Sequence, residues 1–148
     1  MTRRHDTATG DLFSVPKAAA PIEGSMDFRR QISALVGNML TAAARAGIDR
    51  YEVSAQASRL AGRDVSKLML DGYTAESREE FNLPFWLVPV LETVCSSTLL
   101  TDWLASVRGG RVLMGHETID AEIGRLAHER DQASEEIRRL KAMRKGAR

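Results

Sequence analysis

The stretch that decides the fold is DRYEVSAQASRLAGRDVSKLMLDGYT, residues 49–74. Apolar residues recur three or four positions apart on both sides of Gly62, which is the spacing of one face of a helix. Gly62 can adopt a positive φ at little cost and so permits a sharp turn. We therefore expect one helix to begin near Asp49 and to end at this glycine, and a second to run from about Val65 to Tyr73.

The second predicted helix has one apolar and one polar face. We expect Val65, Tyr73 and either Leu68 or Met69 to face the core. A helix-turn-helix module that reads DNA presents short polar or cationic residues at the start of its second helix, as this segment does. The predicted DNA-binding residues are Arg50, Arg59, Arg63, Ser66, Lys67 and Thr74.

These residues would divide the work of binding a duplex. The cations would contact phosphates and set the register, while Ser66 and Lys67, with Leu70 and Asp71 beside them on the outward face, would reach base edges. Asp64 and Asp71 place acid near this face, which argues against sequence-specific binding. The alternative is an αα-hairpin in a helical core with ordinary surface charges.

Further helices are expected on both sides of this segment. An apolar periodicity predicts a helix from Asp27 to Gly47. The most apolar run, residues 83–91, predicts a short, deeply buried helix that is irregular near Pro89. Another helix is expected over 99–107, with Trp103 and Leu104 facing inward. The sequence thus predicts an all-α fold with a compact helical domain over residues 26–110, while the tail of residues 1–25 is expected to be mobile.

A long helix is predicted from Glu117 onward, within a C-terminal region of residues 111–148. Its apolar residues alternate at spacings of four and three, as in a coiled coil, and Arg130 occupies one a position. We expect this stripe to dimerise; the alternative is that it packs on the protein's own core. The predicted dimerisation residues are Ile123, Leu126, Ile137 and Leu140.

Two terminal segments could bind partners. Residues 138–148 hold six cations and no acid, which would complement the helix dipole or form a phosphate-binding arm. In the tail, Leu12 and Phe13 form an apolar island, and Asp11-Leu12-Phe13 resembles the core of peptides that bind bacterial sliding clamps. The alternative is that this island packs on its own domain.

Nothing in the sequence requires catalysis. His5, His116 and His128 are isolated, and no motif with metal-ligand spacing or phosphate-cradling loop is present. Cys95 lies in an apolar run, where a thiol is inert. We therefore predict a non-enzyme without metal or cofactor. The sequence has no apolar run long enough for a membrane span, and its first residues do not read as a secretory signal, so a cytoplasmic location is expected.

Several segments together resemble known phage proteins. Residues 49–71 resemble the helix-turn-helix segment of small regulators carried by temperate phages, and residues 83–95 with 99–104 resemble their second helical pair. Over residues 10–145 the chain is similar to uncharacterised early-region proteins of Mu-like transposable phages and prophages. This resemblance implies a DNA-binding, regulatory role in a bacterial host. Together with the predicted dimerisation of the C-terminal helix, it leads us to expect a dimeric regulator that binds double-stranded DNA. The alternative is a phage adaptor or inhibitor that binds a host or phage protein.

Overall fold

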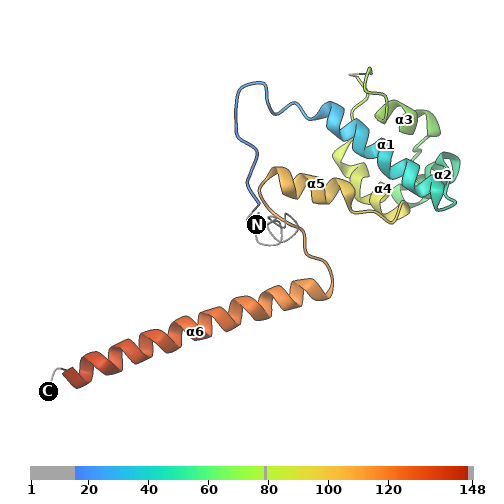
Figure 1. The fold of residues 1–148 in the computed structure, drawn as a ribbon. Helices are drawn as coiled ribbons and strands as arrows, with labels where there is room; N and C mark the ends of the chain where they lie inside the picture. Colours follow the sequence, from blue (N-terminus) through green and yellow to red (C-terminus); the bar gives the residue numbers. More distant parts are fainter. Residues whose placement is uncertain (1–15, 79, 147–148) are drawn as a thin grey trace, which may run out of the picture. The chain divides into compact units, whose positions relative to one another are not determined.

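A computed structural model describes residues 16–78 and 80–146 (Figure 1). Throughout these ranges the regular structure is helical, and the one β interaction is an isolated bridge between Ala18 and Arg108. The predicted all-α class is therefore confirmed, as is the long C-terminal helix. The chain divides into two compact units, one ending at Arg111 and the other beginning at Val112.

The first unit is built from short helices whose ends follow local sequence signals. Asp49 caps the second of them through a bond from the Glu52 amide (2.9 Å), and Gly62 ends it with a φ of 63°. Ser66 caps the next by accepting from the Met69 amide (3.2 Å). The helices are α1 (Arg29–Arg45), α2 (Arg50–Ala61), α3 (Lys67–Tyr73), the 3-10 helix η2 (Phe85–Leu87), α4 (Val88–Val94) and α5 (Leu99–Val107).

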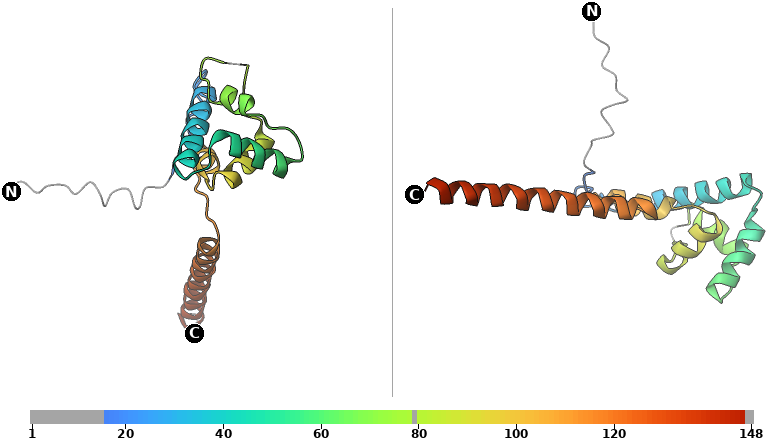
Figure 2. Two further views of the ribbon diagram at one scale, coloured as in Figure 1. Left: turned by 90° about the vertical axis from the view of Figure 1, so that its right-hand side faces the viewer. Right: turned by 90° about the horizontal axis from the view of Figure 1, so that it is seen from below.

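One hydrophobic core joins these elements. Helix α1 packs against α3 and α5, while α2 packs against α3 and α4 (Figures 1 and 2). Each helix contributes one apolar stripe, as its periodicity predicts. The side chains with at most 1% exposure are Val36, Met39, Leu40, Val53, Ala57, Val65, Leu70, Leu87 and Leu91.

Helix α3 begins two residues later than expected, and this changes which residues face the core. Leu70, expected on the outward face, is fully buried, whereas Leu68 is 69% exposed. Ser66 is the N-cap, so Val65 lies outside α3, and the buried face of the helix carries Leu70 and Tyr73. The expectation for Leu70 was therefore wrong. Of the two alternatives Leu68 and Met69, it is Met69 that packs, half-buried, against the core.

The apolar run before α4 is only partly buried, which corrects a second expectation. Leu87 is fully buried, but Phe85 is 76% and Trp86 41% exposed. The three residues of η2 point in different directions because a 3-10 turn places successive side chains about 120° apart. Leu104 on α5 was also expected to face inward and is 42% exposed instead. These side chains leave apolar surface uncovered on the first unit.

Residues 18 and 19 lie beside the end of α5. The amide of Ala19 donates to the carbonyl of Val107 at 2.9 Å, next to the bridge between Ala18 and Arg108. The apolar island Leu12-Phe13 lies outside the described residues, so its predicted docking stays a prediction.

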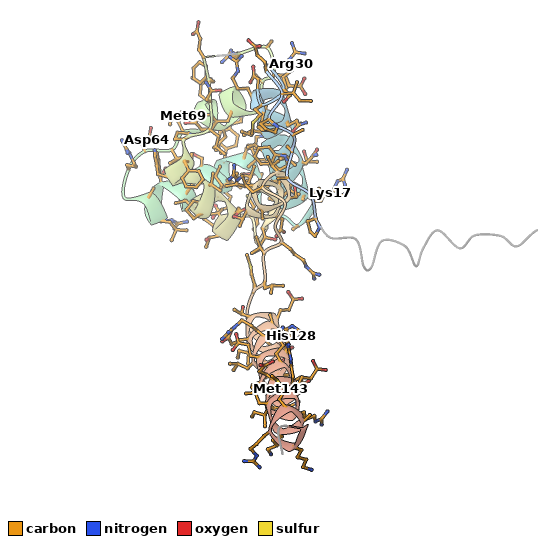
Figure 3. The ribbon with its side chains drawn as sticks, turned by 90° about the vertical axis from the view of Figure 1, so that its left-hand side faces the viewer. Lys17, Arg30, Asp64, Met69, His128 and Met143 are labelled. Carbon is orange, nitrogen blue, oxygen red and sulfur yellow. The ribbon has the colours of Figure 1, made fainter. Side chains whose placement is uncertain are left out.

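The second unit contains one long helix, α6 (His116–Gly146), drawn without a break in Figure 2. Its side chains surround the helix axis, as the labelled His128 and Met143 illustrate in Figure 3. The four predicted dimerisation residues, Ile123, Leu126, Ile137 and Leu140, are all between 51% and 58% exposed. Among the described helices, none combines the length and the apolar character needed to cross a membrane.

Candidate functional site

Two serines of α2 hold the connection to α3. Ser58 Oγ accepts a hydrogen bond from the Val65 amide (2.9 Å), and Ser54 Oγ donates to the Val65 carbonyl (2.7 Å). Ser58 also donates to the Ser54 carbonyl at 2.8 Å. Both backbone groups of a fully buried residue are thereby satisfied. The small Ala57, on the same helix, is completely buried.

Asp71 on α3 is shared by two of the predicted DNA-binding cations. Its Oδ1 lies 2.5 Å from Arg50 Nη1, and its Oδ2 lies 2.6 Å from Lys67 Nζ. The same Arg50 nitrogen lies 3.4 Å from Thr74 Oγ1, and Lys67 Nζ also stands 5.4 Å from the centre of the Tyr51 ring. The start of α2 and both ends of α3 are thus joined by one charged cluster, about two-thirds shielded from solvent.

The cluster changes the titration of its members. Hydrogen bonds from Lys67 and then from Arg50 lower the pKa of Asp71 below its usual value. The bond to Asp71 raises the pKa of Lys67. At neutral pH both groups are therefore charged. Arg50 and Lys67 can bind a phosphate only by sharing with, or leaving, this carboxylate.

Two other arginines extend from the turn region in a different setting. The guanidinium of Arg63 lies 4.8 Å from the centre of the Trp86 ring. Stacking of this kind covers one face of the guanidinium and leaves its N–H edges able to donate. Arg59 lies 3.6 Å from Glu52, and its side chain is 71% exposed. In Figure 3, Asp64 marks the turn between α2 and α3, directly after Arg63.

The predicted residues therefore fall into three groups. The first group surrounds Asp71 and consists of Arg50, Lys67 and Thr74. No sequence pattern predicted this charged cluster as a whole. The spacing of Lys67 and Asp71 by four residues is a local signal for half of it. Ser66 has a structural task, because its hydroxyl caps α3. The remaining two are exposed: Arg59 lies on the last turn of α2, and Arg63 lies in the turn that follows.

An apolar groove lies elsewhere on the first unit, and the sequence analysis missed it. It has a volume of about 660 Å³ between the start of α1, η2 and α5. Phe28 and Trp103 meet edge to face in its wall, with ring centres 5.4 Å apart. Exposed Phe85 and Leu104 belong to its lining as well. Contiguous exposed apolar surface of this kind is typical of binding sites on soluble proteins.

The described residues offer no site for metal chemistry. In residues 16–78 and 80–146, no three His, Cys, Asp or Glu side chains are grouped closely enough to hold an ion. Burial raises the pKa of the Cys95 thiol to about 11, so little thiolate forms at neutral pH.

Comparisons with known proteins add no relative. The chain matches no family model, no curated protein and no solved structure.

Proposed function

We propose that this protein is a non-catalytic DNA-binding regulator of a phage or prophage that acts as a homodimer in the bacterial cytoplasm. The observation that carries the proposal is the pair Arg59 and Arg63, exposed on the last turn of α2 and in the turn that leads to α3. Arginines placed there would contact phosphates on the backbone of a duplex. Helix α3, which begins with Lys67, would then face the major groove of the DNA.

The Asp71 cluster sets the order of these contacts. Arg59 and Arg63 need no rearrangement within the Asp71 cluster to meet phosphates. Lys67 and Arg50 must first exchange some of their contact with Asp71 for a phosphate oxygen. Contacts with the phosphate backbone of the duplex would dominate such binding, and the affinity would depend steeply on salt concentration.

The test is binding of the full chain to labelled duplex DNA at several salt concentrations. The variant Arg63→Ala with Lys67→Ala should weaken binding and reduce the slope of log K against log salt by about 2, one for each lost phosphate contact. The matched control, Arg30→Ala with Arg111→Ala, removes the same charge from exposed positions outside the α2–α3 region. Equal losses in the two variants would contradict the assigned face.

A second candidate function is protein binding through the apolar groove. Phe85 is 76% exposed in its lining, which is unusual for a large aromatic side chain and favours a partner with apolar side chains. The protein would then be a phage adaptor or inhibitor that binds a host or phage protein.

The two functions separate on variants of the groove. Phe85→Ser with Leu104→Ser should leave DNA affinity and its salt dependence unchanged if the α2–α3 region binds DNA. Absence of duplex binding by the unaltered chain at low salt would contradict the first proposal. If the unaltered chain captures a partner protein and the groove variant does not, the result would support protein binding through the groove.

A further inference from the structure

Within the described part of the second unit, no other element covers the apolar stripe of α6. Ile123, Leu126, Ile137 and Leu140 are each more than half exposed along a helix of 31 residues. Helices in water gain most of their stability from burying such a face, and local propensity adds little. Burial of the stripe takes an apolar partner surface of similar length, about 26 Å from Ile123 to Leu140 at 1.5 Å per residue.

The charges of α6 indicate what that partner is. Residues 116–131 contain five acids and two arginines, whereas residues 132–146 contain five cations and two acids. The two halves therefore carry net charges of −3 and +3, with histidine neutral. A second α6 running the opposite way would place each half against its complement. A parallel copy would place like charge on like charge along the whole length.

The heptad positions support the same arrangement. In register, an antiparallel pair places Ile123 against the partner's Leu140 and Ile137 against the partner's Leu126. At the centre, Arg130 then packs against the partner's Ala133, so a long side chain lies over a small one. A parallel pair would instead place Arg130 on its own copy and Ala133 on its own copy. That arrangement combines like-charge repulsion with an unfilled layer.

One contact opposes the antiparallel arrangement, and the structure shows how it is reduced. Glu129 and Glu136 occupy g positions, which face each other in an antiparallel pair. Within each helix, however, Arg125 forms an ion pair with Glu129, and Arg139 lies 4.0 Å from Glu136. These arginines partly neutralise the acids before a second chain arrives, so the repulsion is weaker than the sequence alone indicates.

We propose that α6 binds α6 of a second copy as an antiparallel two-stranded coiled coil centred between Arg130 and Ala133. The proposal rests on the dimeric state given under the proposed function, and it does not depend on DNA binding. It also assigns an interchain ion pair between Asp120 and the partner's Lys141, which occupy facing e positions. The pair forms twice, once at each end.

Cross-linking of the full chain tests the orientation. In a Cys95→Ala background, Ile119→Cys and Arg144→Cys are prepared separately and then mixed under oxidising conditions. Antiparallel pairing brings the thiol introduced at position 119 of one variant beside the thiol introduced at position 144 of the other, so only the mixed disulfide should form. Parallel pairing brings each introduced thiol beside its own copy, and about 37 Å would separate positions 119 and 144. Disulfides formed only within each variant would overturn the proposal.

Charge exchange gives an independent readout by sedimentation. Lys141→Glu alone and Asp120→Lys alone should each raise the dimer Kd severalfold, and the double variant should restore it. Failure of this rescue, or a monomer at all concentrations studied, would also overturn the proposal. DNA binding is measured separately: an antiparallel dimer that binds no duplex would contradict the proposed function while leaving this inference intact.

Discussion

Glu92 on α4 accepts two hydrogen bonds from a single residue of α5, Thr101. The Thr101 amide donates to Oε1 at 2.8 Å, and its hydroxyl donates to Oε2 at 2.6 Å. Glu92 is only 9% exposed. Among the described residues it is the charged side chain that is buried. The two bonds fix the angle between α4 and α5 because both carboxylate oxygens are committed.

We predict that Glu92→Ala lowers the free energy of unfolding by about 2–3 kcal/mol, since a charged acceptor is lost and the Thr101 donors are left unpaired. Thr101→Val removes only the hydroxyl and should cost about 1 kcal/mol. Urea denaturation measures both. The exposed Glu80→Ala serves as control, and a loss for Glu92→Ala no larger than for this control would show that the bonds contribute nothing.

Asp71→Asn should weaken the connection between α2 and α3 by about 1 kcal/mol at neutral pH, because the ion pairs with Arg50 and Lys67 are lost from a site that is one-third exposed. The pKa of Asp71 is lowered in the folded protein, so its stabilisation is present above its unfolded pKa near 4 and is lost as pH falls through the folded value. Thermal unfolding from pH 7 to pH 3 should show the two proteins converging on the acid side.

The control for this experiment is Asp64→Asn in the exposed turn. A difference between Asp71→Asn and the unaltered protein that stays constant down to pH 3 would contradict the assigned role of the carboxylate. If the first proposed function holds, Asp71→Asn should also tighten binding to duplex DNA at low salt, because Arg50 and Lys67 are then released toward phosphate.

Gly109→Ala should detach residues 18 and 19 from the end of α5. Gly109 has a φ of +73°, where a residue with a Cβ is strained by about 1–2 kcal/mol. The added Cβ would lie 2.5 Å from the Ala18 amide nitrogen, which is backbone and cannot rotate away. In the unaltered protein the Ala19 amide donates to the Val107 carbonyl, and hydrogen exchange at this amide should become faster in the variant.

Gly110→Ala is the matched control for that variant. A Cβ at Gly110 meets its nearest atom, the Ala105 carbonyl oxygen, at an ordinary 3.5 Å. Exchange at Ala19 should therefore change little. Similar protection in Gly109→Ala and Gly110→Ala would mean that the contact between Ala18 and the end of α5 does not depend on this glycine.

Cys95 should react slowly with thiol reagents in the folded protein. With its pKa raised to about 11, roughly one molecule in a thousand carries the thiolate at pH 8. Alkylation by iodoacetamide should be about a hundredfold faster in urea, and the folded-state rate should rise with pH up to the raised pKa. A folded-state rate close to that in urea at pH 8 would contradict this.

Local signals in the sequence determined the helices themselves. Asp49, Gly62 and Ser66 act within a few residues of their own position, through caps and a left-handed turn, so a single stretch of sequence contains the cause and its effect. The same holds for α6, whose periodicity and charge distribution can be read without knowledge of other segments. The all-α class and the long C-terminal helix follow from these local causes.

Only the tertiary structure decided how the side chains between helices are used. Asp71 meets Arg50 across 21 positions, and Arg63 meets Trp86 across 23. Neither pairing has a local signal, because a side chain's partner depends on how helices cross. The burial of Leu70 and the exposure of Phe85 were decided in the same way. Val65 contacts the core from outside α3, so its position does not set which face of the helix is buried, and the 3-10 turn directs Phe85 away from Leu87.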